Sequence, residues 1–165
     1  MLHRLKAKGA FVDCYMVDVP GQWTQADFVE ALYTTRLFKL ERLLIRVLAF
    51  KPSSDHEARE LALGHRDTFA VWKVESRSPD QLLLADQTGR TRSWLMTEPP
   101  SAGRTTTRLL FGSAVIPRTD KRSGEQRFGL LFKLLLGFHG AYSVALLRAA
   151  AVRLSAVKVN HPLQS

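Results

Sequence analysis

The sequence predicts an α+β fold built from one antiparallel sheet and a long carboxy-terminal helix. One observation is the order of the predicted elements: a strand, two helices, a series of turn-linked strands and a final helix. Strands segregated from helices in this way are typical of α+β domains. The other is an apolar run at residues 134–147, which supplies a helix able to cover one face of such a sheet. We expect residues 1–165 to form a single domain, with its core at about residues 10–155 and loose termini.

The first third of the chain predicts a strand followed by two helices. Residues 11–20 alternate apolar with more polar side chains and end at a Pro-Gly turn. The apolar positions of this alternation are Val12, Cys14 and Met16. Thr24 then begins a helical pattern, with Asp27 where a capping box places an acidic residue. The β-branched pair at positions 34–35 predicts a break, and so two helices instead of one rod.

The middle of the chain predicts strands separated by turns. The composition of residues 51–57 is that of a loop, and a short strand is expected at 60–66. Alternation and short apolar runs predict longer strands at 68–75, 81–87, 90–97 and 105–116. The final helix is predicted from about Glu125 to Leu154. This pattern indicates a hairpin-linked antiparallel sheet with the last helix as its cover.

The apolar run near the carboxy terminus admits two interpretations. Fourteen residues from Leu134 to Leu147 carry no formal charge. A membrane-spanning helix needs about 20 apolar residues, and runs of this length are more often buried core helices. A window at 128–152 is long enough, but it includes Lys133 and Arg148, whose side chains would have to snorkel. We therefore favour a core helix over a membrane span.

Bulk properties exclude some classes of protein and favour others. The single cysteine, Cys14, allows no internal disulfide and no cysteine-based zinc site. No sustained apolar segment precedes Asp13, so a secretion signal is not expected. We predict a cytoplasmic location, with a peripheral position at the inner membrane surface as the alternative. The net charge of +9 favours acidic partners, although a soluble protein that is merely basic is the simpler interpretation.

Three segments carry a resemblance to a known family. They are QLLLADQTGRTRSWLMT at 81–97, TTTRLLFGSAV at 105–115 and FGLLFKLLLGFHGAYSVALLRAA at 128–150. Together they resemble a bacterial family of unknown function within the START-like superfamily, which has the helix-grip (SRPBCC, Bet v 1-like) fold. The last helix of that family carries a Gly–hydrophobic–aromatic run and a Phe-His pair, which Gly129–Phe132 and Phe138-His139 match. The strand at 90–97 departs from the family because it lacks a histidine often found there.

The resemblance implies a curved antiparallel sheet wrapped around the last helix, with an apolar cavity between them. Proteins of this shape bind lipids, polyketide-like rings, hormones or other apolar ligands, and a minority catalyse cyclisation, hydration or similar steps. The expected partner is an apolar or amphipathic small molecule, and the expected lining residues are Trp72, Trp94, Phe132, Leu136, His139 and Tyr142. No G-x-G-x-x-G motif opens a helix after a strand, so no dinucleotide or other cofactor is expected.

His139 is the one candidate for general acid–base chemistry. On a helix it shares a face with Tyr142 and Ser143, where a neutral imidazole could orient a ligand or transfer a proton. The simpler interpretation is a packed histidine bonded to a backbone carbonyl or to Tyr142. Ser113 lies outside a G-x-S-x-G motif, and no H-E-x-x-H metal motif is present. Our leading hypothesis is a binding module without catalysis, and the alternative is a START-like enzyme that uses His139.

A row of cations on the second predicted helix suggests a third hypothesis. Its members, spaced by three, three and four residues, are Arg36, Lys39, Arg42 and Arg46. They form one stripe opposite an apolar face that contains Leu37, Leu40 and Leu44 and, in part, Val47. The stripe could contact phospholipid headgroups, which makes a peripheral membrane or interaction protein an alternative. Nucleic acid is less favoured because the three tryptophans are dispersed. The simplest interpretation is a solvated helix face.

Overall fold

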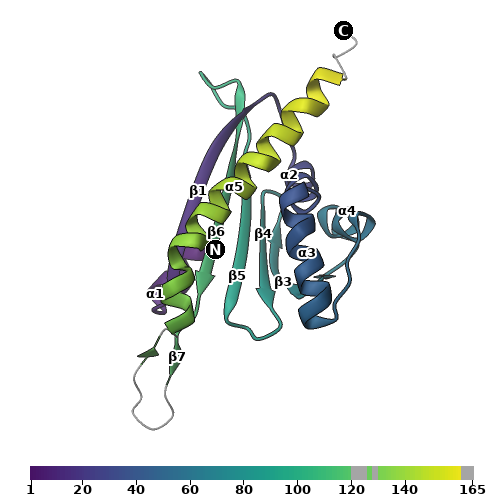
Figure 1. Cartoon of the computed structure of the whole chain (residues 1–165). Helices are drawn as coiled ribbons and strands as arrows, with labels where there is room; N and C mark the ends of the chain where they lie inside the picture. The colour runs from purple at the N-terminus through teal and green to yellow at the C-terminus, as the bar shows by residue number, and fades with distance from the viewer. Residues whose placement is uncertain (120–125, 128–129, 161–165) are drawn as a thin grey trace.

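A computed structural model describes residues 1–119, 126–127 and 130–160, with side chains for all of these except 44, 48–49, 118–119, 126–127, 130–138 and 158–160. The predicted α+β class is confirmed: a six-stranded antiparallel sheet packs against helices that include a long carboxy-terminal one (Figure 1). The elements are α1 (Leu2–Ala7), β1 (Phe11–Pro20), α2 (Gln25–Tyr33), α3 (Arg36–Ala49), α4 (Asp55–Leu63), β2 (Thr68–Phe69), β3 (Trp72–Ser78), β4 (Gln81–Asp86), β5 (Thr91–Glu98), β6 (Thr106–Val115), β7 (Arg118–Thr119), β8 (Gln126–Arg127) and α5 (Leu130–Asn160).

The strand order is β1-β6-β5-β4-β3-β2, so the first strand lies beside the last strand of the sheet. Strands β2 to β6 form a meander, and β1 pairs antiparallel with β6 along its whole length. In this register Asp13 lies opposite Ser113, and Tyr15 lies opposite Phe111. The pairing therefore brings side chains a hundred positions apart onto the same part of the sheet.

Helix α5 crosses one face of the sheet, and α2, α3 and α4 lie beside it (Figure 1). Leu146, Leu147, Ala150 and Leu154 of α5 belong to the main core cluster together with residues of α2, α4 and the sheet. By length and composition alone, His139–Val157 of α5 could also cross a membrane. Its inner side packs in the core through these four residues, but only 28% of this segment is buried, so the structure does not decide between the two interpretations. The helix begins and ends later than predicted.

The break between the first two helices is where the β-branched pair predicts it. Thr34 caps the end of α2, and its hydroxyl donates to the carbonyl of Glu30. The Thr35 side chain accepts a hydrogen bond from the backbone N–H of Phe38 and so begins α3. The expected capping box of Thr24 and Asp27 is also present at the start of α2. These local signals fix where the helices begin and end.

The strand predicted at 60–66 is wrong, because residues 55–63 form helix α4. Ser54 and Glu57 form a capping box at its start, and Gly64 ends it in the left-handed conformation at φ +82°. Both signals can be recognised in the sequence, because S-x-x-E indicates the start of a helix and a following glycine indicates its end. Ala58 and Leu61 become fully buried against the rest of the core. The loop predicted at 51–57 is correspondingly shorter.

The chain start, expected to be loose, instead forms helix α1 on the opposite face of the sheet. Leu2 is buried there in a second cluster with Leu83, Trp94 and Ala114. Gly112 permits this approach. A Cβ at that position would lie 2.5 Å from Leu2 Cδ1 and 2.8 Å from the carbonyl oxygen of Asp13. The glycine is therefore needed where α1 and the neighbouring strand press closely on β6.

The side of β1 that faces the helices is not the one marked by the apolar alternation. Tyr15, Val17 and Val19 pack against the main core, while Cys14 and Met16 are exposed. Asp13 shares the inward side. Both sides of this strand carry apolar residues, so only the position of α5 decides which side is buried.

Candidate functional site

A cavity of about 200 Å³ lies between the sheet and α5. Its walls come from α2, α3, α5 and strands β3, β5 and β6. Leu32, Phe38, Phe111 and Leu146 supply most of the apolar lining. Each of these side chains is nearly fully buried, whereas the His139 side chain is 32% exposed, so the cavity extends from the interior of the fold toward solvent.

An aromatic group fixes one wall of the cavity. The ring of Tyr33 lies 4.8 Å from that of Phe38 in an edge-to-face arrangement and 5.2 Å from that of Phe69. Such pairs stabilise a packed interior beyond the area they bury. The Tyr33 ring is therefore packed on two sides, with its hydroxyl at the cavity.

Glu41 of α3 and Tyr142 of α5 meet at the cavity, where the Tyr142 hydroxyl donates to Glu41 Oε2. Burial raises the pKa of the Glu41 carboxyl, and the hydrogen bond from Tyr142 opposes this rise only in part. Burial, together with the nearby Glu41 carboxylate, also raises the pKa of Tyr142. This pair links two helices across the cavity through a carboxyl group that resists ionisation.

Asp13, Ser113 and His139 form a second polar group at the cavity wall. The Ser113 hydroxyl donates to Asp13 Oδ1 at 2.6 Å, and the Ser113 backbone N–H donates to the same oxygen at 3.0 Å. His139 Nε2 lies 2.7 Å from Ser113 Oγ and 3.6 Å from Asp13 Oδ2. Because the serine proton is directed to Asp13, we assign Nε2 as the protonated nitrogen that donates to Ser113.

This group does not have the geometry of a Ser-His-Asp triad. In a triad the carboxylate contacts one ring nitrogen and the serine contacts the other. Here Asp13 and Ser113 both approach Nε2 of His139, and the serine hydroxyl donates directly to the carboxylate. The arrangement orients the imidazole and does not activate the serine as a nucleophile.

Three buried polar atoms at the cavity have no hydrogen-bond partner among the described residues. They are the Tyr33 hydroxyl, Trp72 Nε1 and Ser143 Oγ. Burial raises the pKa of Tyr33, so its hydroxyl keeps its proton. Ser93 lies beside this hydroxyl and opposes the rise of the Tyr33 pKa. The two side chains do not, however, meet the geometry of a hydrogen bond. Each unpaired group costs about 1–3 kcal/mol, so their gathering at one cavity points to a bound molecule or water.

The structure brings together part of the predicted lining. Trp72, His139 and Tyr142 line the cavity. The side chains of Phe132 and Leu136 lie outside the described residues. Trp94 is on the opposite face of the sheet, in the cluster under α1, and its indole donates to Gln81 Oε1 at 3.1 Å. The inward positions of β5 are instead Ser93 and Leu95, because β5 alternates from one face to the other.

The predicted basic stripe is only partly present. Arg36, Lys39 and Arg46 are exposed, but the side chain of Arg42 is only 12% exposed. Arg42 donates to Asp55 Oδ1 at 2.7 Å and to the Ser53 carbonyl at 3.0 Å. It therefore ties α3 to the segment that leads into α4. The stripe is one residue shorter than the sequence pattern predicts.

Among the polar residues of the site, the sequence did not identify Asp13, Tyr33 or Glu41, and it singled out Ser113 only as a nucleophile to be rejected. Glu41 lies three residues after Phe38, which turns toward the cavity, so helical spacing could have identified it. Asp13 falls on the same side of β1 as Tyr15 and could have been found in the same way. Ser113 needed the β1–β6 register, which the sequence does not give.

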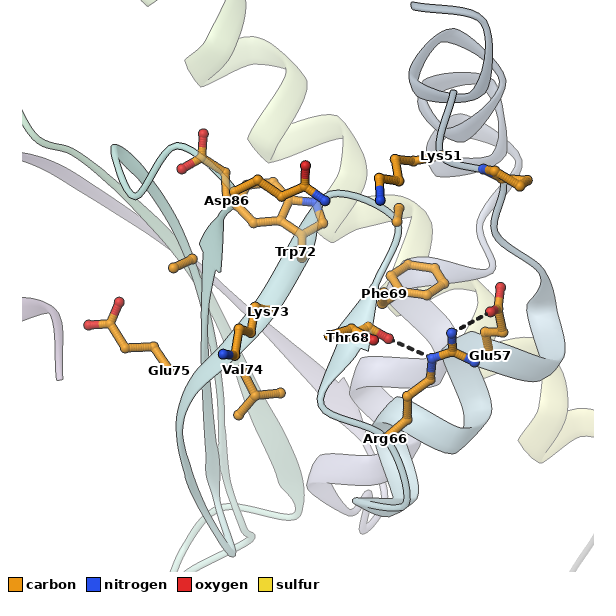
Figure 2. Close-up of a pocket in the computed structure, with 14 residues that line it drawn as sticks. Lys51, Glu57, Arg66, Thr68, Phe69, Trp72, Lys73, Val74, Glu75 and Asp86 are labelled. Atoms are coloured by element: carbon orange, nitrogen blue, oxygen red, sulfur yellow. Dashed lines mark hydrogen bonds and ion pairs between the residues drawn. The ribbon is translucent and has the colours of Figure 1, made fainter. Parts of the chain in front are cut away.

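A larger open groove lies at the sheet edge beside β2 and β3, with a volume of about 740 Å³ (Figure 2). Its rim carries both signs of charge, including Lys51, Lys73 and Asp86. Arg66 in this groove is already bonded to Glu57 at 2.8 Å and to the Thr68 carbonyl at 2.7 Å (Figure 2). Its charged groups are thus partly paired with each other, and the smaller cavity is the better candidate site.

Comparison with known proteins gives no relative. No protein-family model, no curated protein and no solved structure matches the chain. Within the described residues, no group of three or more His, Cys, Asp or Glu side chains could hold a metal ion.

The two buried serines of the site should respond in opposite ways to the same substitution. Ser113→Ala removes a hydroxyl that connects Asp13 and His139, so the free energy of unfolding should fall by about 1–3 kcal/mol. Ser143→Ala removes a buried hydroxyl without a partner among the described residues, so stability should be unchanged or slightly higher. Urea unfolding of the ligand-free variants measures both, and equal losses would contradict the assignment.

Glu41 should make stability depend on pH. Its folded-state pKa is raised from 4.5, so the folded chain binds this proton more tightly than the unfolded chain. The contribution is present below pH 4.5 and is lost as the pH rises through the folded-state pKa. Urea unfolding of wild type and Glu41→Gln from about pH 4 to 8 isolates it, because other titrating groups affect both proteins. Parallel stability curves would exclude this role for Glu41.

Proposed function

We propose that the protein is a binding module that holds a small amphipathic molecule in the cavity between the sheet and α5, without catalysing a reaction. The observation that carries this proposal is the gathering of Tyr33 Oη, Trp72 Nε1 and Ser143 Oγ, buried and without partners among the described residues, around an apolar space. Pockets for small molecules combine such an apolar lining with a few placed polar groups.

The size and chemistry of the cavity restrict the ligand. A dry cavity of about 150 Å³ accepts benzene, so about 200 Å³ suits a one- or two-ring compound or a short chain. All three unpartnered groups can donate a hydrogen bond, and the tryptophan indole can only donate. The ligand should therefore carry an acceptor, such as a ketone or ester oxygen, at the end that meets them.

The resemblance to the START-like superfamily supports the same proposal. The six-stranded antiparallel sheet and the long last helix are compatible with a helix-grip fold. We place the chain in this superfamily as part of the proposal, and its members bind apolar molecules between these two elements. The cavity occupies the corresponding place.

A second candidate function is proton transfer by His139. The observation that favours it is the contact of the imidazole with Ser113 and Asp13, because an oriented imidazole near a carboxylate is a common general acid or base. Binding remains the preferred function because Nε2 of His139 already contacts Ser113 and Asp13.

Acetophenone and ethylbenzene form a matched pair of probes for the cavity, since they share a ring and differ in one acceptor oxygen. We expect acetophenone to raise the melting temperature of the wild type more than ethylbenzene does. Ser143→Ala should weaken acetophenone binding by roughly tenfold, as for a lost hydrogen bond, and leave ethylbenzene binding nearly unchanged. Met16→Gln, an exposed change on β1, is the control. No shift with either probe would contradict a ring-sized cavity.

Isolating the natural ligand and testing whether the protein converts it would distinguish binding from catalysis. Native mass spectrometry of gently purified protein should detect a small molecule that Ser143→Phe excludes. Incubating that molecule with wild type and with His139→Gln then tests proton transfer. We expect the molecule to be recovered unchanged from both proteins. Conversion by the wild type to a product that differs in mass, chromatographic retention or spectrum, lost in His139→Gln, would instead establish the enzyme.

A further inference from the structure

The outward face of α3 and the residue that follows it carry a row of exposed apolar side chains. Leu40 is 57% exposed, Leu43 53%, Val47 62% and Phe50 85%. Their spacing of three, four and three residues places them on one side of the helix. The sequence pattern placed Leu40 and, in part, Val47 on the apolar face opposite the cations. The inner face instead consists of side chains such as Phe38 and Glu41, which line the cavity.

Phe50 strengthens the case that this row has a role. It caps α3 in the left-handed conformation, with φ at 51°. Glycine or asparagine normally occupies such a position, and a bulky side chain there is strained. The chain thus places a large aromatic residue at a costly backbone position and leaves its side chain almost fully exposed. Burial against the rest of the protein does not offset that cost.

Cations border the apolar row. Arg36, Lys39, Arg46 and Lys51 are exposed, and the single acidic residue of α3, Glu41, faces the cavity. Asp55, the nearest acid along the chain beyond α3, is held by Lys39 at 2.5 Å and by Arg42 at 2.7 Å. An apolar row with a basic border on one helix face is the pattern of helices that lie in a membrane interface.

We infer that α3 docks the protein on an anionic phospholipid surface. The helix lies in the plane of the interface, its four apolar side chains enter the boundary of the acyl chains, and its cations contact lipid phosphates. A second copy of the chain is a poorer occupant, because a two-fold contact through this face would bring the same cations together. The inference does not depend on what the cavity holds, since it uses the opposite side of α3.

Co-sedimentation with two kinds of vesicle tests this docking. We expect binding to phosphatidylcholine vesicles that contain phosphatidylglycerol, and little binding to phosphatidylcholine alone. The double variant Val47→Gln/Phe50→Gln should lose roughly tenfold or more in affinity, since two insertion contacts are removed. Arg46→Glu and salt at about 1 M should also weaken binding, because screening then acts within about 3 Å.

Two exposed apolar residues elsewhere provide matched controls. Met16→Gln on β1 and Val152→Gln on α5 should leave vesicle binding within about twofold, because neither residue lies on α3. Circular dichroism and urea unfolding should show that every variant stays folded. Loss of binding in Val152→Gln but not in the α3 variants would assign the contact to α5 and overturn the inference. So would equal binding to both vesicle types, no binding to either, or a dimer that Phe50→Gln dissociates.

Discussion

The antiparallel pairing of β1 with β6 joins the first strand of the chain to the last strand of the sheet, and the other features depend on it. The pairing puts Asp13 opposite Ser113, and so creates the polar pair that receives His139 from α5. It also presents Tyr15 and Val17 to the core beneath that helix. Because these segments are far apart in the sequence, the site depends on long-range contacts and not on local structure.

The interior is a compromise between packing and polarity. Burying three unpartnered polar atoms costs several kcal/mol at about 1–3 kcal/mol each, against a net stability of about 5–15 kcal/mol for a typical domain. Apolar replacements at Tyr33 or Ser143 would avoid that cost, and the surrounding aromatic wall would tolerate them in size. A ligand with an acceptor oxygen would satisfy these groups. We therefore regard the cavity as the part of the fold whose composition is least explained by stability.

Helix α3 takes part in both proposals through two different faces. Its inner face contributes Phe38 and Glu41 to the cavity, and its outer face carries the exposed row that ends at Phe50. Arg42 lies between these two faces and anchors α3 to the segment that follows it, by hydrogen bonds to Asp55 and to the Ser53 carbonyl. A molecule leaving a lipid surface would thus meet the cavity only one helix away. The two proposals are independent, but they are compatible in space.

The sequence by itself determined the features that depend on neighbouring residues. The α+β class, the capping box at Thr24, the break at Thr34–Thr35 and the long last helix follow from local periodicity and capping, which act within a few residues. The capping box at Ser54 could also have been recognised, although part of the helix that it begins was predicted as a strand. For the site, periodicity and resemblance together predicted Trp72, His139 and Tyr142.

Tertiary structure alone decided which side is buried in the elements that carry apolar residues on both sides. Trp94 and Leu95 are adjacent and both apolar, and only the placement of α1 and α5 assigns them to opposite faces of the sheet. The same holds for α3, where tertiary packing turned Arg42 inward and Leu40 outward against the sequence pattern. When both sides of an element carry apolar residues, periodicity is ambiguous. Contacts with distant segments then settle the orientation, because they determine how much surface is removed from water.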